Sequence, residues 1–232
     1  MLMKIIFSFP RVLSFALFFC LLPVLVFVSA PEAPHLSAPR AANSSVHQVV
    51  LCLGDCLTAG YGLDKAEAYP ALLQKKIDTL GWNFEVVNAG LSGETTAGGL
   101  RRLDWFLKRK IDVLILALGG NDALRGIPLE ATKKNLDDIL ARTHERYPKA
   151  KLVIAGMLIP TNWGREYFNG FRALFPELAA KHKAHIVPFL LEGVGGKPEL
   201  NFPDGIHPTS EGQQIVAENV WKVLKPVLSA MK

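Results

Sequence analysis

Residues 111–118 read Ile-Asp-Val-Leu-Ile-Leu-Ala-Leu, and Gly119-Gly120-Asn121-Asp122 follows at once. The run is apolar almost throughout, which is typical of a central strand buried on both faces of a sheet. The two glycines permit a sharp turn where the strand stops. We therefore interpret this run as the middle of a parallel sheet.

Strand and helix patterns alternate on both sides of this run. Short apolar stretches that end at turns predict strands, and apolar residues spaced three or four apart predict helices. This alternation indicates an α/β fold with three layers, in which helices cover both faces of a parallel sheet. The predicted strands are 48–53, 84–88, 111–118, 151–157 and 185–189; the predicted helices are 68–80, 95–108, 129–147, 165–181 and 210–228, with Pro176 expected to kink or split the fourth helix.

Three unusual loops follow predicted strands, at residues 54–60, 88–96 and 119–126. In open parallel sheets, ligands bind beyond the carboxyl ends of the strands. We expect the functional site where these loops meet.

The first 30 residues form a separate block. Lys4 and Arg11 precede or flank an apolar run at 12–28, and Ser29-Ala30 supplies small residues for cleavage. This pattern predicts a signal peptide at 1–30, or an uncleaved N-terminal anchor, because the apolar run is near the shortest that spans a bilayer. Residues 31–46 read as a flexible linker, and one domain fills 47–232. The protein is accordingly expected to be exported to the periplasm or the medium, with the anchor as its one link to a membrane.

The charge excludes a nucleic-acid-binding class. The chain carries 26 basic and 21 acidic residues, a net charge of +5, and loss of Lys4 and Arg11 with the leader would leave +3. The basic run Lys108-Arg109-Lys110 closes a predicted helix, where cations interact favourably with the helix dipole. Cys52 and Cys56, the cysteines beyond the leader, show no zinc-binding spacing and lie too far apart on an extended strand for a disulfide.

Three segments could carry chemistry. Asp204 precedes His207 by three residues, a spacing that lets a carboxylate orient an imidazole acting as a general base. Asn121 follows the central strand, where its amide can point into the crevice or stabilise the turn, and Gly93 either offers a backbone N–H or permits positive φ. Each signal alone fits a structural role as well.

Together these segments resemble the four sequence blocks of the SGNH (GDSL-like) hydrolase family, in family order. Gly54-Asp55-Cys56-Leu57 resembles the GDSL block; the others are Ser92-Gly93-Glu94-Thr95, Gly119-Gly120-Asn121-Asp122 and Asp204-Gly205-Ile206-His207-Pro208. The segments 59–63 and 119–126 are similar to the bacterial arylesterase, thioesterase and lysophospholipase branch.

The resemblance implies a flavodoxin-like, doubly wound sheet of about five strands and ester hydrolysis without metal or cofactor. It implies a catalytic set of Cys56, His207 and Asp204. The implied oxyanion hole comprises the backbone N–H groups of Cys56 and Gly93 and the side-chain amide of Asn121.

The chain departs from the family at the nucleophile, where Cys56 stands in place of serine. Three functions follow: hydrolysis through a thioacyl intermediate, acyl transfer from that thioester, or binding of lipid or glycan by a degenerate site. We expect hydrolysis, with an imidazolium at His207 lowering the pKa of Cys56. Ser92 and Thr58 are the weaker candidates for a substitute nucleophile.

The substrate is expected to be a small-molecule or lipid ester. Trp163 and Tyr167, with Phe168, follow the fourth predicted strand and either line an acyl or aryl pocket or belong to the core.

Overall fold

The computed structural model describes residues 47–159 and 164–232, all of which belong to one unit. Their centre is a five-stranded sheet in the order β2-β1-β3-β4-β5, with every neighbouring pair parallel. This confirms the predicted α/β fold. The strands are β1 (Gln48–Gly54), β2 (Phe84–Gly90), β3 (Val113–Ala117), β4 (Lys151–Ala155) and β5 (His185–Val187).

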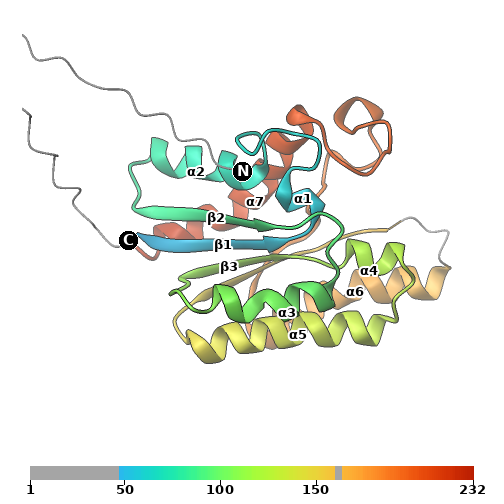
Figure 1. Ribbon diagram of the computed structural model, residues 1–232, viewed down its shortest axis with the longest axis horizontal. Helices are drawn as coiled ribbons and strands as arrows, with labels where there is room; N and C mark the ends of the chain where they lie inside the picture. Colours follow the sequence, from blue (N-terminus) through green and yellow to red (C-terminus); the bar gives the residue numbers. More distant parts are fainter. Residues whose placement is uncertain (1–46, 160–163) are drawn as a thin grey trace, which may run out of the picture. The chain divides into compact units, whose positions relative to one another are not determined.

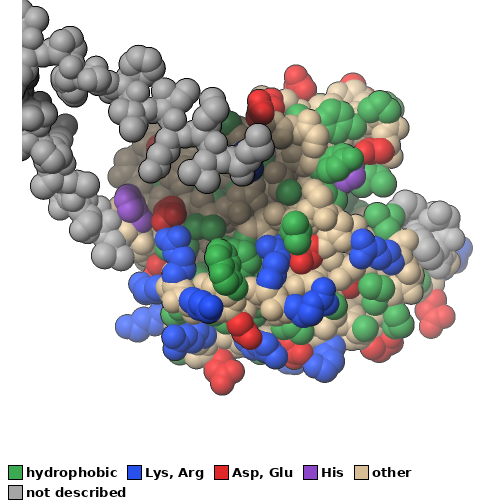
Figure 2. Space-filling view, in the orientation of Figure 1, with side chains coloured by type: hydrophobic (Ala, Val, Ile, Leu, Met, Phe, Trp, Pro, Cys, Tyr) green, Lys and Arg blue, Asp and Glu red, His purple; other side chains and the backbone are tan. Residues whose placement is uncertain are grey.

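Helices cover both faces of the sheet (Figure 1). One face carries α1 (Cys56–Ala59), α2 (Tyr69–Thr79) and α7 (Ser210–Ser229). The other carries α3 (Thr96–Phe106), α4 (Gly120–Leu124), α5 (Leu129–Arg146) and α6 (Arg165–His182). Acidic and basic side chains are interspersed over the outer surface of α3 and α5, as expected for solvated helix faces (Figure 2).

The middle of the sheet forms the core. All five residues of β3 are buried, and six of the seven residues of β1 are buried as well. Strands enclosed on both faces must be apolar throughout, which is why the run at 111–118 predicts the sheet so directly. No helix in residues 47–159 or 164–232 is long and apolar enough to cross a membrane.

Three strands end level with one another. Gly54, the last residue of β1, pairs with Gly90 of β2 and with Ala117 of β3. The chain therefore leaves these strands side by side, and the segments that follow are brought to one place at the carboxyl edge of the sheet.

The structure differs from the sequence prediction in its short helices. Residues 56–59 and 120–124 form α1 and α4 where loops were expected, and a 3₁₀ turn, η2, spans Pro198–Leu200. The expected split at Pro176 is wrong, because α6 continues through it. Phe171, Leu174, Phe175 and Leu178 of this helix are buried in the core, and this packing holds the helix together across the missing backbone donor.

Candidate active site

Cys56 lies at the start of α1, directly beyond the carboxyl end of β1. Asp55 caps this short helix, and its Oδ1 accepts a hydrogen bond from the Leu57 N–H at 3.0 Å. Close packing demands glycine at position 54, since a Cβ there would lie 2.0 Å from Thr58 Oγ1. The sharp turn thus presents Cys56 at the edge of the sheet, and its thiol is free of any disulfide.

His207 and Asp204 lie together on the segment between η2 and α7. His207 Nδ1 and Asp204 Oδ2 are 2.7 Å apart, and Asp204 Oδ1 accepts from the backbone N–H groups of Ile206 and His207. Hydrogen bonds from His207 and Ile206 lower the pKa of Asp204 to about 2. Because the carboxylate is ionised, Nδ1 carries the proton and Nε2 is left as the basic nitrogen.

The ring of Tyr61 lies over this imidazole, with the two centroids 4.3 Å apart. Tyr61 also donates its backbone N–H to the Cys56 carbonyl at 3.1 Å. One residue therefore contacts both the cysteine segment and the histidine. The sequence analysis included Tyr61 in the segment 59–63 that resembles the arylesterase branch, but it assigned this tyrosine no role.

Gly93 and Asn121 both approach the sulfur of Cys56. The Gly93 backbone and the Asn121 side chain donate hydrogen bonds that stabilise a Cys56 thiolate. Gly93 has a φ of +76°, a conformation that glycine adopts without strain, and its carbonyl accepts from Arg125 at 2.8 Å. The two donors that the resemblance implies for an oxyanion hole thus both lower the pKa of Cys56.

The pKa of Cys56 is nevertheless raised. Burial of the thiol and the negative charge of Asp55 outweigh the hydrogen bonds from Gly93 and Asn121. The expectation of a ready thiolate is therefore wrong, and the resting group is a neutral thiol. Proton removal must accompany any attack by this sulfur.

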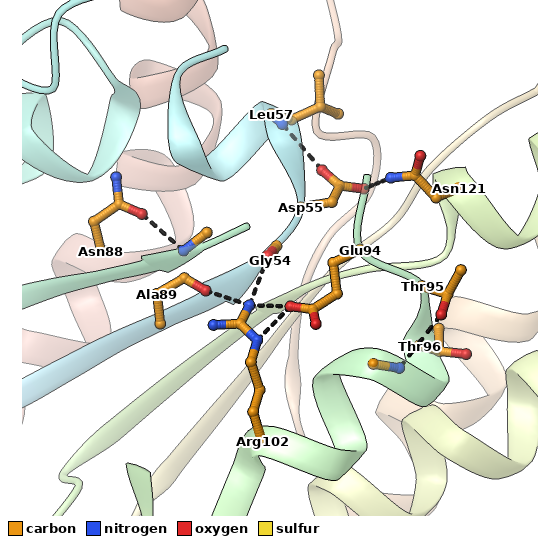
Figure 3. A network of polar contacts seen from close by, with 12 residues as sticks. Gly54, Asp55, Leu57, Asn88, Ala89, Glu94, Thr95, Thr96, Arg102 and Asn121 are labelled. Atoms are coloured by element: carbon orange, nitrogen blue, oxygen red, sulfur yellow. Dashed lines mark hydrogen bonds and ion pairs between the residues drawn. The ribbon is translucent and has the colours of Figure 1, made fainter. Parts of the chain in front are cut away.

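Asp55 joins the cysteine segment to Asn121. Its side chain is almost completely buried, and Oδ2 accepts from Asn121 Nδ2 at 3.3 Å (Figure 3). Burial raises the pKa of Asp55 to about 6, although hydrogen bonds from Leu57 and Asn121 and the charge of His207 oppose this rise.

A buried ion pair fixes the loop that carries Gly93. Arg102 of α3 pairs with Glu94 and also donates to the carbonyls of Ala89 at 2.6 Å and Gly54 at 3.2 Å (Figure 3). One guanidinium therefore ties the ends of β1 and β2 to the Gly93 loop. The sequence analysis missed this link, because Glu94 and Arg102 are indistinguishable from surface charges until the fold brings them inside.

Asp122 holds a second link, between α4 and the start of α3. Its carboxylate accepts from the Thr96 N–H at 2.8 Å, from Thr96 Oγ1 at 2.5 Å and from Thr132 Oγ1 at 3.3 Å. The carboxylate is buried and satisfied by the neighbouring segment, which positions the Asn121 turn against the Gly93 loop.

The remaining residues that the sequence analysis named differ in their surroundings. Thr58 is buried, with Oγ1 3.0 Å from the Tyr69 hydroxyl, whereas Ser92 is exposed. Tyr167 donates its hydroxyl to the Ile127 carbonyl at 2.9 Å and packs with Phe168 against the core. Trp163 lies outside the described residues. Among the residues that are described, no three His, Cys, Asp or Glu side chains are grouped to hold a metal ion.

Comparison with known proteins identifies close relatives. Residues 52–215 match the model of the GDSL-like lipase/acylhydrolase family. The chain is 41% identical to esterase TesA of Pseudomonas aeruginosa over 182 residues, covering 78% of this chain and 90% of that protein. It is 36% identical to thioesterase 1/protease 1/lysophospholipase L1 of Escherichia coli K12, covering 81% and 88%.

A solved structure extends this likeness to three dimensions. The psychrotrophic esterase EstA from Pseudoalteromonas, inhibited by monoethylphosphonate, matches with a TM-score of 0.74 at 32% identity. The match covers 78% of this chain and 99% of that one. The two chains therefore share the fold over almost the whole of that structure.

Proposed function

Because the chain belongs to the GDSL-like lipase/acylhydrolase family and is a carboxylic ester hydrolase, we propose that it cleaves aryl, alkyl or acyl-chain esters through a covalent acyl intermediate on Cys56. The observations that carry this proposal are the Asp204–His207 pair, 2.7 Å apart, and the hydrogen bonding by which Gly93 and Asn121 lower the pKa of the Cys56 sulfur. Donors aimed at that atom stand ready for the oxyanion that forms beside it during attack.

Acylation begins with proton transfer. His207 Nε2 removes the thiol proton as the Cys56 sulfur bonds to the carbonyl carbon, and the carbonyl oxygen becomes an oxyanion held by the N–H groups of Cys56 and Gly93 and the Asn121 amide. The ionised Asp204 stabilises the imidazolium. The carbon–oxygen bond of the ester then breaks, and the departing alcohol takes the proton from His207, which leaves a thioester.

Deacylation reverses these roles. His207 removes a proton from water, the resulting oxygen attacks the thioester, and the carbon–sulfur bond breaks. The Cys56 sulfur recovers the proton from His207. The raised pKa of Cys56 favours this return to the neutral thiol.

An apolar rim around the site supports a substrate with an acyl or aryl group. We define the apolar rim as five large hydrophobic side chains that are 42–52% exposed: Tyr61, Leu91, Leu124, Leu158 and Ile206. Each follows a different strand of the sheet. Exposed apolar side chains in five segments that follow the carboxyl ends of the strands fit a hydrophobic ligand better than a solvated surface.

Turnover of p-nitrophenyl butyrate by residues 47–232 in reducing buffer tests the proposal. Cys56→Ala should abolish the turnover, and Cys56→Ser should retain it, because serine supplies the family's usual nucleophile. Equal turnover by the native domain and by Cys56→Ala would contradict a role for this thiol. A product that forms only after an amine acceptor is added would favour acyl transfer over hydrolysis.

We also propose that the N-terminal block directs export of the protein from the cytoplasm. Residues 1–30 serve as a signal peptide or an anchor and 31–46 as a linker, so the hydrolase acts in the periplasm or outside the cell. Mass spectrometry of the protein recovered from the periplasm tests this: a mature chain that begins after Ala30 supports cleavage, and intact protein in the membrane fraction supports an anchor.

A further inference from the structure

Unpaired cations gather at the amino edge of the sheet, opposite the candidate active site. We define the basic edge as Lys108, Arg146, Lys149, Lys151 and Lys183, which are all exposed. They lie just before β3, β4 and β5 or open β4, and parallel strands begin at a shared edge. Figure 2 shows Lys and Arg side chains gathered at the left, where the strands of Figure 1 begin.

These cations form one continuous surface. One hollow is lined by Lys149, Lys151 and Lys183, and a second by Arg146, Lys149 and Lys151. A third hollow is shared by Lys108 and Arg146. Successive hollows share lining residues, so the charges lie side by side along the edge.

The cations of the basic edge are not held in ion pairs, although Asp104 and Glu145 line the third hollow with Lys108 and Arg146. Other cations near the edge have acidic partners, as Arg109 has Glu85 and Lys110 has Asp112. In the described part of the chain, no residue of the basic edge has an acidic partner within 4.0 Å.

The helix dipole explains part of the set only. It favours cations at helix C-termini, which accounts for Arg146 at the end of α5, Lys183 at the C-cap of α6 and Lys108 just beyond α3. Lys149 lies three residues beyond α5 and Lys151 lies on a strand. Their position at this edge needs another reason.

Two further features lie at the same edge of the sheet. Trp105 is 67% exposed and lines an apolar hollow together with Lys108. The chain enters β1 at the same edge, since Gln48 lines the hollow that contains Lys149 and Lys151. The residues before this point include the apolar run at 12–28.

We propose that the basic edge docks on a bilayer surface that contains anionic lipid, with Trp105 at the headgroup level. Clustered lysines and arginines beside an exposed aromatic side chain are what such a surface attracts. The strands point away from the docked edge, so the Cys56 site at their carboxyl ends faces the solution. This inference does not depend on the proposed chemistry.

Co-sedimentation of residues 47–232 with vesicles tests the docking. We compare vesicles of phosphatidylcholine with phosphatidylglycerol against phosphatidylcholine alone, at low salt. The triple variant Lys108→Gln/Lys149→Gln/Lys151→Gln should bind the anionic vesicles on the order of 100-fold more weakly. The matched control, Lys65→Gln/Arg165→Gln/Lys197→Gln, removes the same charge at the carboxyl edge and should bind nearly as the unmodified domain does. Circular dichroism verifies that both variants are folded.

Tryptophan fluorescence provides an independent readout. Anionic vesicles should shift the emission of the domain to shorter wavelength, and Trp105→Phe should remove that shift. The proposal is overturned if the unmodified domain fails to bind, if phosphatidylcholine alone binds it equally, or if the control triple loses as much affinity as the test triple.

Discussion

Replacing Asp55 by asparagine should change how stability depends on pH. Burial raises the pKa of Asp55 from 3.8 to about 6. Between these values the unfolded chain has lost the proton and the folded chain keeps it, so the free energy of unfolding falls as pH rises. The difference of about 2 pKa units corresponds to about 3 kcal/mol, which is fully lost above pH 6 and regained below the unfolded pKa.

Asparagine preserves the shape of the side chain but cannot ionise. The free energy of unfolding of Asp55→Asn, relative to the unmodified domain, should therefore increase by about 3 kcal/mol from below pH 4 to above pH 6. Any hydrogen bonds that the substitution removes lower the free energy of unfolding equally below pH 4 and above pH 6. Their loss therefore cancels from the difference between the two pH values. The value of kcat should fall on the order of 100-fold, because the carboxylate no longer orients the Asn121 amide.

Urea denaturation of both proteins across pH 3.5 to 7.5 measures this difference, with residues 47–232 as the common background. Asp78 is an exposed aspartate on α2, and Asp78→Asn serves as the matched control. Its free energy of unfolding relative to the unmodified domain should not change with pH. A flat difference for Asp55→Asn as well would show that Asp55 titrates like an exposed carboxylate, and the account of its burial would be refuted.

The other predictions concern the thiol, the ion pair and the carboxylate of the site. Because burial raises the pKa of Cys56, iodoacetamide should alkylate it slowly at neutral pH and faster only at alkaline pH, and mass spectrometry follows the adduct; fast alkylation at pH 7 would argue against a neutral resting thiol. Arg102→Met should destabilise the domain by about 3–5 kcal/mol in urea, because Glu94 is left as an uncompensated buried charge, and adding Glu94→Gln should recover most of this loss. Asp204→Asn should lower kcat on the order of 10⁴-fold with KM little changed, because His207 loses the carboxylate that fixes its tautomer; a loss in KM alone would contradict this role.

The sheet was predictable because a strand buried on both faces requires a nearly continuous run of apolar residues. The runs at 48–53 and 111–118 are apolar except for Gln48 and Asp112, and the structure places them as adjacent central strands. The edge strand β5 shows the limit, since it spans three residues where five were expected. Fewer neighbours at an edge leave the ends of a strand less well defined.

The site was predictable where residues lie close in sequence. The pairing of Asp204 with His207 follows from their spacing on one loop. The contacts of Asp122 with Thr96 and of Arg102 with Glu94, Ala89 and Gly54 join segments that only the fold brings together. The raised pKa of Cys56 likewise depends on burial and on the Asp55 charge, which no local pattern reveals.

The most direct test of the account is to trap the acyl-enzyme. Residues 47–232 are mixed with p-nitrophenyl butyrate, quenched in acid and analysed by intact-mass and peptide mass spectrometry. The account predicts one butyryl group on the peptide that contains Cys56, its removal by hydroxylamine, and its absence in Cys56→Ala. A butyryl group on Ser92, or steady turnover in Cys56→Ala, would contradict the assignment of Cys56 as the nucleophile.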